Sequence, residues 1–306
     1  MSLAIRRLLE ALPTLFVLVT LVFFMMRVAP GGPFDRERAL LPEVEAALQT
    51  QYQLDQPLWR QYLAYLGDLA RGDLGPSLHY EGYRVSELIG QALPVSLALG
   101  LGALLLALVL GLAGGLLAAR YREGWLDRAL MTLASLGLAI PNYVIAPLLI
   151  LLFAVTLGWL PAGGWREGRY ADVLLPVMAL ALPQAAYVAR LMRSSLVEVL
   201  RAPYIRAARA KGLPEFRVLL RHALPAALLP VLSYLGPAAA GLLTGSVVVE
   251  QIFNLPGLGR YFVQAALNRD YTLVLGVVLL YGSLIVLFNF LVDLLYGRLD
   301  PRTLAT

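Results

Sequence analysis

Six long windows without a single Asp, Glu, Lys or Arg constrain this chain more than any other feature of its sequence. They are residues 12–26, 94–119, 129–160, 173–189, 226–249 and 271–292. A helix of about 20 mostly apolar residues crosses the hydrocarbon core of a bilayer. Because backbone polar groups must bond internally there, each window is expected to be helical. The sequence therefore predicts an all-α membrane protein with six transmembrane helices.

The third window differs from the other five. Residues 129–160 are too many for one straight crossing and too few for two, and Pro141, Asn142 and Pro147 lie in the middle. Proline removes a backbone donor and clashes with the preceding turn. A kinked or broken helix is therefore expected there.

Basic residues indicate how the chain is oriented. With the N-terminus in the cytoplasm, the short connections on that side collect most of the arginines, as the positive-inside rule requires. They are Arg120, Arg122, Arg128, the stretch 190–221, Arg298 and Arg302. Both termini are thus expected to be cytoplasmic in a multi-pass protein of the cytoplasmic membrane. The net charge of +5 and the pI near 9.5 then reflect topology, and no nucleic-acid partner is expected.

The N-terminal part is expected to be a retained signal-anchor helix followed by an extracytoplasmic segment. Arg6 and Arg7 precede an apolar stretch, as in a secretory signal peptide, but the stretch ends at residues 26–30 without a small-x-small cleavage site. The expected divisions are 1–93 for this part, 94–293 for a membrane domain of five helices, and 294–306 for a cytoplasmic tail.

The external segment, residues 31–91, has apolar residues at helical spacing. Two short helices are expected, one over 42–53 and one after Pro57 that ends at Gly72 and Gly75. The second carries Trp59, Tyr62, Leu63, Leu66 and Leu69 on one side. These side chains can pack on the outer ends of the spans, contact a partner, or do both.

The stretch between the fourth and fifth spans, about residues 196–225, predicts a loop with a protruding helical knob. Pro203 ends the outgoing helix, a short helix is expected over 204–211, Gly212 suits a left-handed terminus, and Pro214 prevents continuation. Small alanines would let a partner's groove approach, while Arg206 and Arg209 can pair with acidic groups. An ordinary basic cytoplasmic loop fits the spacing equally well.

Missing residues exclude several chemistries. The chain has no cysteine and two distant histidines, His79 and His222, so a metal site or a thiol nucleophile is not expected. Lys211 is the only lysine and precedes Gly212, which excludes a P-loop. The apolar windows hold no ionisable residue for a proton relay, because Glu250 and Asp293 lie at window edges. We expect no catalytic residue, no cofactor in this chain, and a non-enzymatic subunit.

Neutral polar residues within the spans are the candidates for a translocation path. The same residue types also hold helices together in membranes, and both roles stay open. The candidates are Asn142, Gln184, Tyr187, Ser233, Thr244 and Ser246. With no energy source in the chain, active transport needs another protein.

The cytoplasmic stretch resembles a motif of the membrane subunits of binding-protein-dependent ABC importers, in their peptide-transport branch. Ala207, Ala208, Gly212, Leu224 and Pro225 match the motif, whereas Arg206 and His222 replace its consensus Glu and Ile. Stretches similar to the branch occur at 26–34, 72–77, 254–259 and 300–302. The resemblance covers essentially the whole chain.

This resemblance implies a type I ABC importer permease fold with a small external helical segment between helices 1 and 2. It implies a homologous second permease subunit, two cytoplasmic ATPase subunits that bind ATP, an extracytoplasmic peptide-binding protein, and membrane lipid around the helices. Residues 94–293 would then be the ABC transmembrane type-1 domain, with a coupling loop of about 196–225. The implied ATPase-coupling residues are Tyr204, Ile205, Arg206, Ala207, Ala208, Arg209, Lys211, Gly212, Leu213 and Pro214.

The expected function is ATP-driven import of oligopeptides or dipeptides across the cytoplasmic membrane. Import of another solute, nickel or an oligosaccharide, is an alternative within the same architecture. A passive channel would need no coupling knob, and a membrane scaffold would need no polar path. No residue reads out the ligand.

Overall fold

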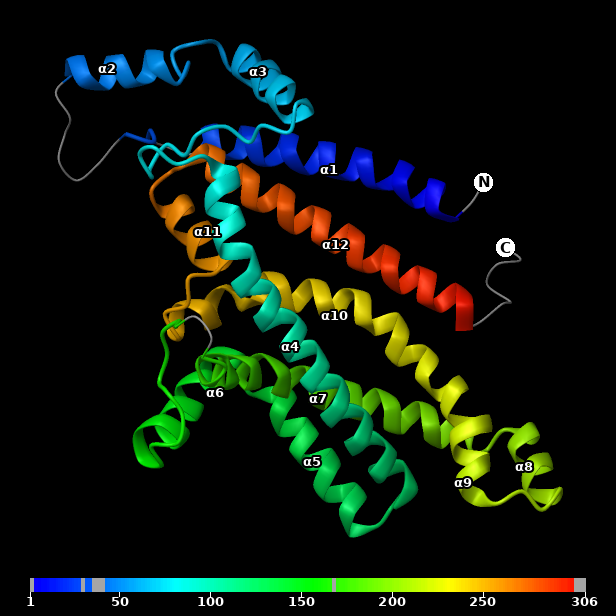
Figure 1. The fold of residues 1–306 in the computed structure, drawn as a ribbon. Helices are drawn as coiled ribbons and strands as arrows, with labels where there is room; N and C mark the ends of the chain where they lie inside the picture. The colour runs from blue at the N-terminus through cyan, green and yellow to red at the C-terminus, as the bar shows by residue number, and fades with distance from the viewer. Residues whose placement is uncertain (1–2, 29–30, 35–41, 167–168, 300–306) are drawn as a thin grey trace. The chain divides into compact units, whose positions relative to one another are not determined.

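The structure is a computed structural model that describes residues 3–28, 31–34, 42–166 and 169–299 (Figure 1). Within these residues the regular elements are helices, and the extended backbone is limited to one isolated bridge between Pro76 and Arg84. The expected all-α class is confirmed. The long helices are α1 (Leu3–Val28), α4 (Val85–Arg120), α7 (Ala171–Val199), α10 (Leu224–Ile252) and α12 (Tyr271–Leu299).

Five described helices are long and apolar enough to cross a membrane, and a sixth crossing is added if one bent pair forms a single span. That pair joins α5 (Trp125–Ala139) to α6 (Asn142–Leu149), which continues as the π-helix η1 (Ile150–Thr156). The two halves are bent by 105°. The break falls at Ile140, whose ψ of 118° is extended because the following Pro141 disfavours a helical conformation at the residue before it. The expected break in the third window is thus confirmed.

The two short helices expected in the external segment are present as α2 (Pro42–Gln51) and α3 (Leu58–Ala70). Gly72 and Gly75 follow with φ of 78° and 81°, a region that favours glycine. Tyr62 packs edge-on against Phe23 of α1 at 5.1 Å and shares a 2.6 Å hydrogen bond with Thr20. Packing on the end of a span is therefore confirmed for Tyr62, whereas Trp59 is 58% exposed and stays open to a partner.

The chain forms two compact units, which are described separately. One comprises Met1–Val95 and Pro256–Ser283, and the other comprises Ser96–Leu255 and Leu284–Thr306. Each unit joins two segments that are distant in the chain but contact one another. The expected divisions at residues 93 and 293 stay a prediction.

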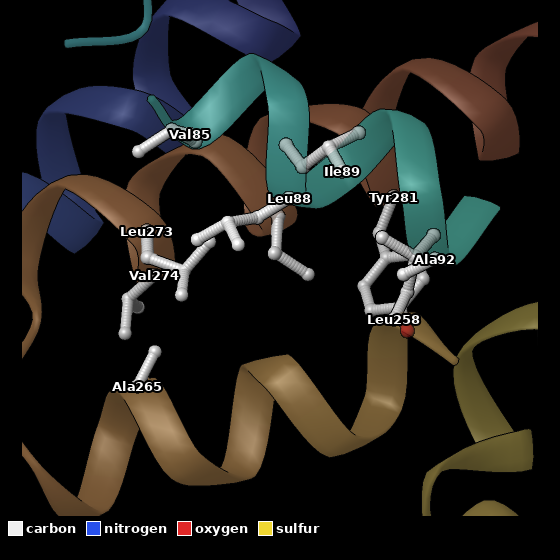
Figure 2. Packing of buried hydrophobic residues seen from close by; sticks show 10 residues of the cluster. Val85, Leu88, Ile89, Ala92, Leu258, Ala265, Leu273, Val274 and Tyr281 are labelled. Carbon is white, nitrogen blue, oxygen red and sulfur yellow. The ribbon is translucent and has the colours of Figure 1, made fainter. Parts of the chain in front are cut away.

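The first unit has a core of ten buried residues from α4, α11 (Leu258–Leu267) and α12 (Figure 2). Asp270, just before α12, fixes the neighbouring external loop, because it accepts hydrogen bonds from the Ser77 hydroxyl and from the backbone N–H of His79 at 3.2 Å. It also caps α12 by accepting the N–H of Leu273 at 3.1 Å. A single buried carboxylate therefore orders both the loop and the helix start.

The second unit packs α4 closely against α7 and α7 against α10. Gly111 and Gly115 lie four residues apart on α4, and a Cβ atom on either would come within 2.8 Å of a backbone oxygen of α7, at Ala185 and Ala189 respectively. Such spacing of small residues allows helix backbones to approach in membranes. The core continues through α8 (Pro203–Ala210) and the π-helix η2 (Val218–Ala223) into α10, whereas the short α9 (Glu215–Arg217) between them has no buried residue.

Candidate translocation path and coupling segment

The break between α5 and α6 brings two of the sequence-predicted path residues together. Asn142 at the start of α6 and Gln184 of α7 both line a pocket of about 160 Å³ in the second unit. The other lining residues are apolar or glycine: Leu138, Ile140, Pro141, Leu180, Pro183, Gly241 and Leu242. Each carboxamide offers a donor and an acceptor, so the pocket pairs neutral polar groups with apolar walls.

Tyr234 of α10 fixes the orientation of Gln184, because its hydroxyl donates a hydrogen bond to the Gln184 Oε1 atom. Tyr187, one turn after Gln184, lies with its ring centroid 4.2 Å from that of Tyr234 and is 42% exposed. Three polar side chains therefore form one cluster where α7 meets α10. Because the Oε1 atom accepts this hydrogen bond, the NH₂ group of Gln184 is left as the donor that other groups can use.

We expect Tyr234→Phe to lower the free energy of unfolding by about 1 kcal/mol, the usual contribution of one hydrogen bond. The matched control is Tyr187→Phe, whose hydroxyl makes no hydrogen bond to a described residue. Thermal or denaturant unfolding of the purified chain measures both. Equal losses in the two variants would contradict the assigned contact.

The remaining three path candidates are satisfied within their own helix. Ser233 donates to the Leu229 carbonyl at 3.1 Å, and Thr244 donates to the Ala240 carbonyl at 2.9 Å. Ser246 is fully buried and donates to the Leu243 carbonyl and to the Glu250 carboxylate. Their role in a translocation path stays a prediction, as does that of the other candidates.

Glu250 is a buried acidic residue that directly follows the charge-free window 226–249. In the structure α10 continues to Ile252, so Glu250 lies within the helix and is 0% exposed. Its Oε1 atom accepts hydrogen bonds from Ser96 of α4 and Ser246 of α10, each at 2.8 Å. The carboxylate thus joins two helices within the second unit. The serine four residues before Glu250 was the only local signal for this cluster.

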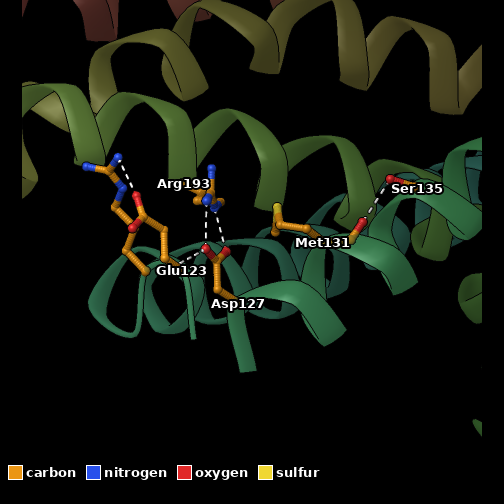
Figure 3. Close-up of polar contacts among 6 residues, drawn as sticks. Glu123, Asp127, Met131, Ser135 and Arg193 are labelled. Carbon is orange, nitrogen blue, oxygen red and sulfur yellow. Dashed lines mark hydrogen bonds and ion pairs between the residues drawn. The ribbon is translucent and has the colours of Figure 1, made fainter. Parts of the chain in front are cut away.

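A second polar contact that sequence reasoning missed joins α5 to α7. The Arg193 guanidinium donates two hydrogen bonds of 2.6 Å to the two carboxylate oxygens of Asp127, as Figure 3 shows. Asp127 is 3% exposed, and it also accepts the backbone N–H of Glu123 at 2.8 Å. Paired donors in this fork geometry fix direction as well as distance. The bridge lies two turns before α7 ends at Val199, just ahead of the expected coupling segment, Tyr204 to Pro214.

The helix expected over 204–211 is present as α8, and it starts one residue earlier because Pro203 occupies its first turn. Ile205 and Ala208 are buried in the core of the second unit. Gly212 follows with φ of 75°, as expected. A Cβ atom added to this glycine would have no neighbouring atom within 4 Å. The exposed residues of the segment are Tyr204, Arg206, Ala207, Arg209, Ala210, Lys211, Gly212 and Pro214.

The charge of this segment is partly compensated by the residue that follows it, Glu215. Arg209 donates to the two carboxylate oxygens of Glu215 at 3.0 and 2.5 Å, and this contact raises the pKa of Arg209 above its usual range. Arg206 makes no ion pair with a described residue. Leu213 packs on the buried core, and Pro214 precedes α9. The segment therefore presents a firm apolar base with an exposed basic face.

Metal chemistry finds no support in the part of the chain that the structure describes. Within it, no group of three or more His, Cys, Asp or Glu side chains could hold an ion. The absence of a cofactor stays an expectation.

The sequence pattern of the family described as "Binding-protein-dependent transport system inner membrane component" matches residues 111–305. The chain belongs to this family. The match includes the broken third span, the pocket with Asn142 and Gln184, and the whole coupling segment. Both the path candidates and the coupling residues thus fall within the family's shared region of the permease.

Curated relatives match this permease over nearly its whole length. It is 52% identical over 297 residues to the oligopeptide transport system permease protein OppB of Haemophilus influenzae, with 97% of each chain covered. It is 51% identical over 298 residues to OppB of Escherichia coli K12, again with 97% of each chain covered. The dipeptide transport system permease protein DppB of Bacillus subtilis is 44% identical over 298 residues, covering 97% of this permease and 96% of the relative.

Solved structures resemble the permease in fold. A crystal structure of the MetNI methionine ABC transporter in an inward-facing conformation aligns with a TM-score of 0.58 at 21% identity, covering 70% of this chain and 97% of that one. A crystal structure of an amino acid ABC transporter with histidines aligns at 0.53 and 22% identity, covering 70% and 94%. The type I ABC importer permease fold expected from the sequence is confirmed.

Proposed function

We propose that the chain is the transmembrane permease subunit of an ATP-driven importer that translocates oligopeptides or dipeptides across the cytoplasmic membrane. The observation that carries this proposal is the 52% identity to an oligopeptide permease protein over 97% of both chains. The pocket with Asn142 and Gln184 supports it, because neutral carboxamides can bond peptide groups without selecting a charged side chain.

The proposed assembly contains a homologous second permease, two cytoplasmic ATPase subunits, and an extracytoplasmic peptide-binding protein, surrounded by membrane lipid. This chain binds no cofactor and is not an enzyme; ATP is bound and hydrolysed by the ATPases. Both termini are cytoplasmic. The basic connections at Arg120, Arg122 and Arg128 support this orientation.

The proposed coupling segment is Tyr204 to Pro214, seated in a groove of an ATPase subunit. Its exposed basic face provides the contact, and its buried Ile205 and Ala208 pass motion into the second unit. Closure of the ATPases then shifts the permease between inward-open and outward-open states, because the two states make different contacts with the ATPases.

Gly212→Glu tests the coupling segment. We expect it to reduce ATP-dependent uptake of a labelled tripeptide by at least tenfold in proteoliposomes holding all the subunits. The reason is that glutamate strains a backbone with φ of 75° and adds a negative charge at the docking face. ATPase docking, measured by co-purification, should weaken in parallel.

The matched control is Gly82→Glu, because Gly82 also has a positive φ, 81°, and no atom within 4 Å of a built Cβ, but lies outside the coupling segment. Equal uptake by the two variants would sink the coupling role. Uptake without ATP would instead favour the passive channel. Inhibition by excess nickel or an oligosaccharide, but not by unlabelled peptide, would favour another solute.

A further inference from the structure

A second pocket, of about 220 Å³, lies wholly within the unit made of Met1–Val95 and Pro256–Ser283. The end of α1, the turn after α2, one side of α3, the loop at 73–78 and the start of α12 form its walls. The polar residues that line it are Arg27, Gln51, Gln53, Gln61, Asp68, Asp73, Tyr52, Tyr65, Tyr271 and Thr272. By the orientation proposed above, it faces the extracytoplasmic side.

Arg27 is the only cationic residue among the lining residues. Its guanidinium lies 3.6 Å from the centre of the Phe23 ring and 5.2 Å from that of Tyr271, so two aromatic faces hold it. Its Nε donates to Gln61 at 3.0 Å and one terminal nitrogen contacts the Phe23 carbonyl at 3.5 Å. The other N–H groups make no hydrogen bond, and no carboxylate pairs with Arg27, among the described residues.

The two acidic residues of the pocket are already engaged elsewhere. Asp68 lies 3.8 Å from Arg71, and Asp73 accepts hydrogen bonds from Arg84 and from the backbone N–H of Gly75 at 2.9 Å. The Arg84 contact holds the pKa of Asp73 below its usual range. Neither acid neutralises Arg27, so the pocket keeps a positive group held by rings and an amide.

Tyr65, which also lines the pocket, has a hydroxyl without a hydrogen-bond partner among the described residues. Its hydroxyl is covered and makes no hydrogen bond to a described residue. Burial raises the pKa of Tyr65 to about 12 against the opposing effect of the nearby Arg27 charge, so at neutral pH the group is an O–H donor. Buried polar groups normally find a partner, and one without a partner points to a missing water, ion or ligand.

We propose that this pocket binds the free C-terminal carboxylate of a peptide, with the Arg27 guanidinium as its ligand. The planar fork of arginine matches the two oxygens of a carboxylate, and the remaining N–H groups of Arg27 supply the donors. A cation held in a partly enclosed site is costly unless an anion accompanies it.

The size of the pocket favours the end of a chain over a whole ligand. Pockets that enclose drug-sized ligands have volumes of roughly 300–1,000 Å³, above the 220 Å³ found here. A terminal residue can enter while the rest of the peptide extends outward. This inference rests on the proposed function, since it assigns one contact to the proposed substrate.

Equilibrium binding to the purified full-length chain in lipid nanodiscs tests the proposal. The probes are labelled trialanine, which has a free carboxylate, and trialanine amide, which does not. We expect amidation to weaken binding to the wild type at least tenfold. Arg27→Gln should weaken trialanine binding by the same factor and leave amide binding unchanged, because the variant and the probe remove the same contact.

Two further variants separate binding from folding. Arg27→Lys keeps the charge but loses the fork, and we expect an intermediate loss for trialanine. Arg60→Gln removes an exposed arginine of α3 that does not line the pocket and contacts Gln56 and Trp59 instead, so it should leave binding unchanged. Equal binding of acid and amide to the wild type, or an Arg27→Gln effect on both probes alike, would overturn the proposal.

A third probe identifies the source of the carboxylate. N-acetyl-aspartate amide carries only a side-chain carboxylate, and it should bind at least tenfold more weakly than trialanine. Equal binding would overturn the assignment to a peptide end. Peptide uptake in proteoliposomes tests the proposed function separately. If the wild type imports peptide but binds acid and amide equally, only this site is contradicted. If it binds the acid more tightly than the amide but imports no peptide, the proposed function is contradicted.

Discussion

Arg193→Met is expected to lower the free energy of unfolding of the purified permease by about 3–5 kcal/mol. Methionine keeps much of the side-chain length but leaves the Asp127 carboxylate, only 3% exposed, without its two 2.6 Å hydrogen bonds. Removing one partner of a buried pair is costly because the other charge stays desolvated. Denaturant unfolding in detergent micelles measures the loss.

Two companion variants test the cause of that loss. Adding Asp127→Leu to Arg193→Met removes the stranded charge, so most of the lost stability should return. Arg122→Met breaks a pair with Glu123 in which both side chains are exposed, and should cost less than about 1 kcal/mol. The buried-pair explanation fails if Arg193→Met is no more harmful than Arg122→Met.

Gly111→Ala is expected to destabilise the permease by about 1–3 kcal/mol, although alanine normally favours a helix. The new Cβ would lie 2.6 Å from the Val188 Cβ and 2.8 Å from the Ala185 carbonyl oxygen. Since a backbone oxygen cannot rotate away, α4 and α7 must separate. Their small-residue contact would then be lost.

The same helix supplies the control for this prediction. Gly90, also in α4, has no atom within 4 Å of a built Cβ, so Gly90→Ala should stabilise the chain by about 0.5–1 kcal/mol. Thermal unfolding of both variants reports the two opposite signs. A gain in stability for Gly111→Ala would show that the helices are not held at this distance.

Element positions were predictable from the sequence because local chemistry decides them. Apolar windows of sufficient length specify the long helices, and proline specifies the break before Asn142 and the start of α8. Gly212 occupies the left-handed region expected for it. Helix ends were less certain, since α10 and α12 extend past the charge-free windows.

Polar contacts between helices were not predictable in the same way. Arg193 and Asp127 are 66 residues apart, and Ser96 and Glu250 are 154 apart, so only tertiary packing brings them together. A search for charge-free windows also places acids at the edges by construction. The burial of Glu250 was therefore not predictable, although hydrogen bonds from partner hydroxyls offset the desolvation cost of a carboxylate between two helices.

The candidate path shows an intermediate case. Asn142 and Gln184 were chosen by residue type, and the structure brings both to one pocket. Ser233 and Thr244 were chosen by the same rule, yet each bonds to its own helix backbone. Residue type alone cannot separate these outcomes, because hydroxyls can satisfy themselves locally whereas carboxamides need more partners.

The construction of α8 makes the coupling segment a natural cassette for engineering. Prolines bound it on both sides, at 203 and 214, and it packs on the core of its unit through Ile205, Ala208 and Leu213. On the docking proposed above, recoding only its solvent-facing positions should change which ATPase subunit binds it, without refolding the permease. Two transporters whose permeases bind only their own ATPase subunits would then operate in the same cell.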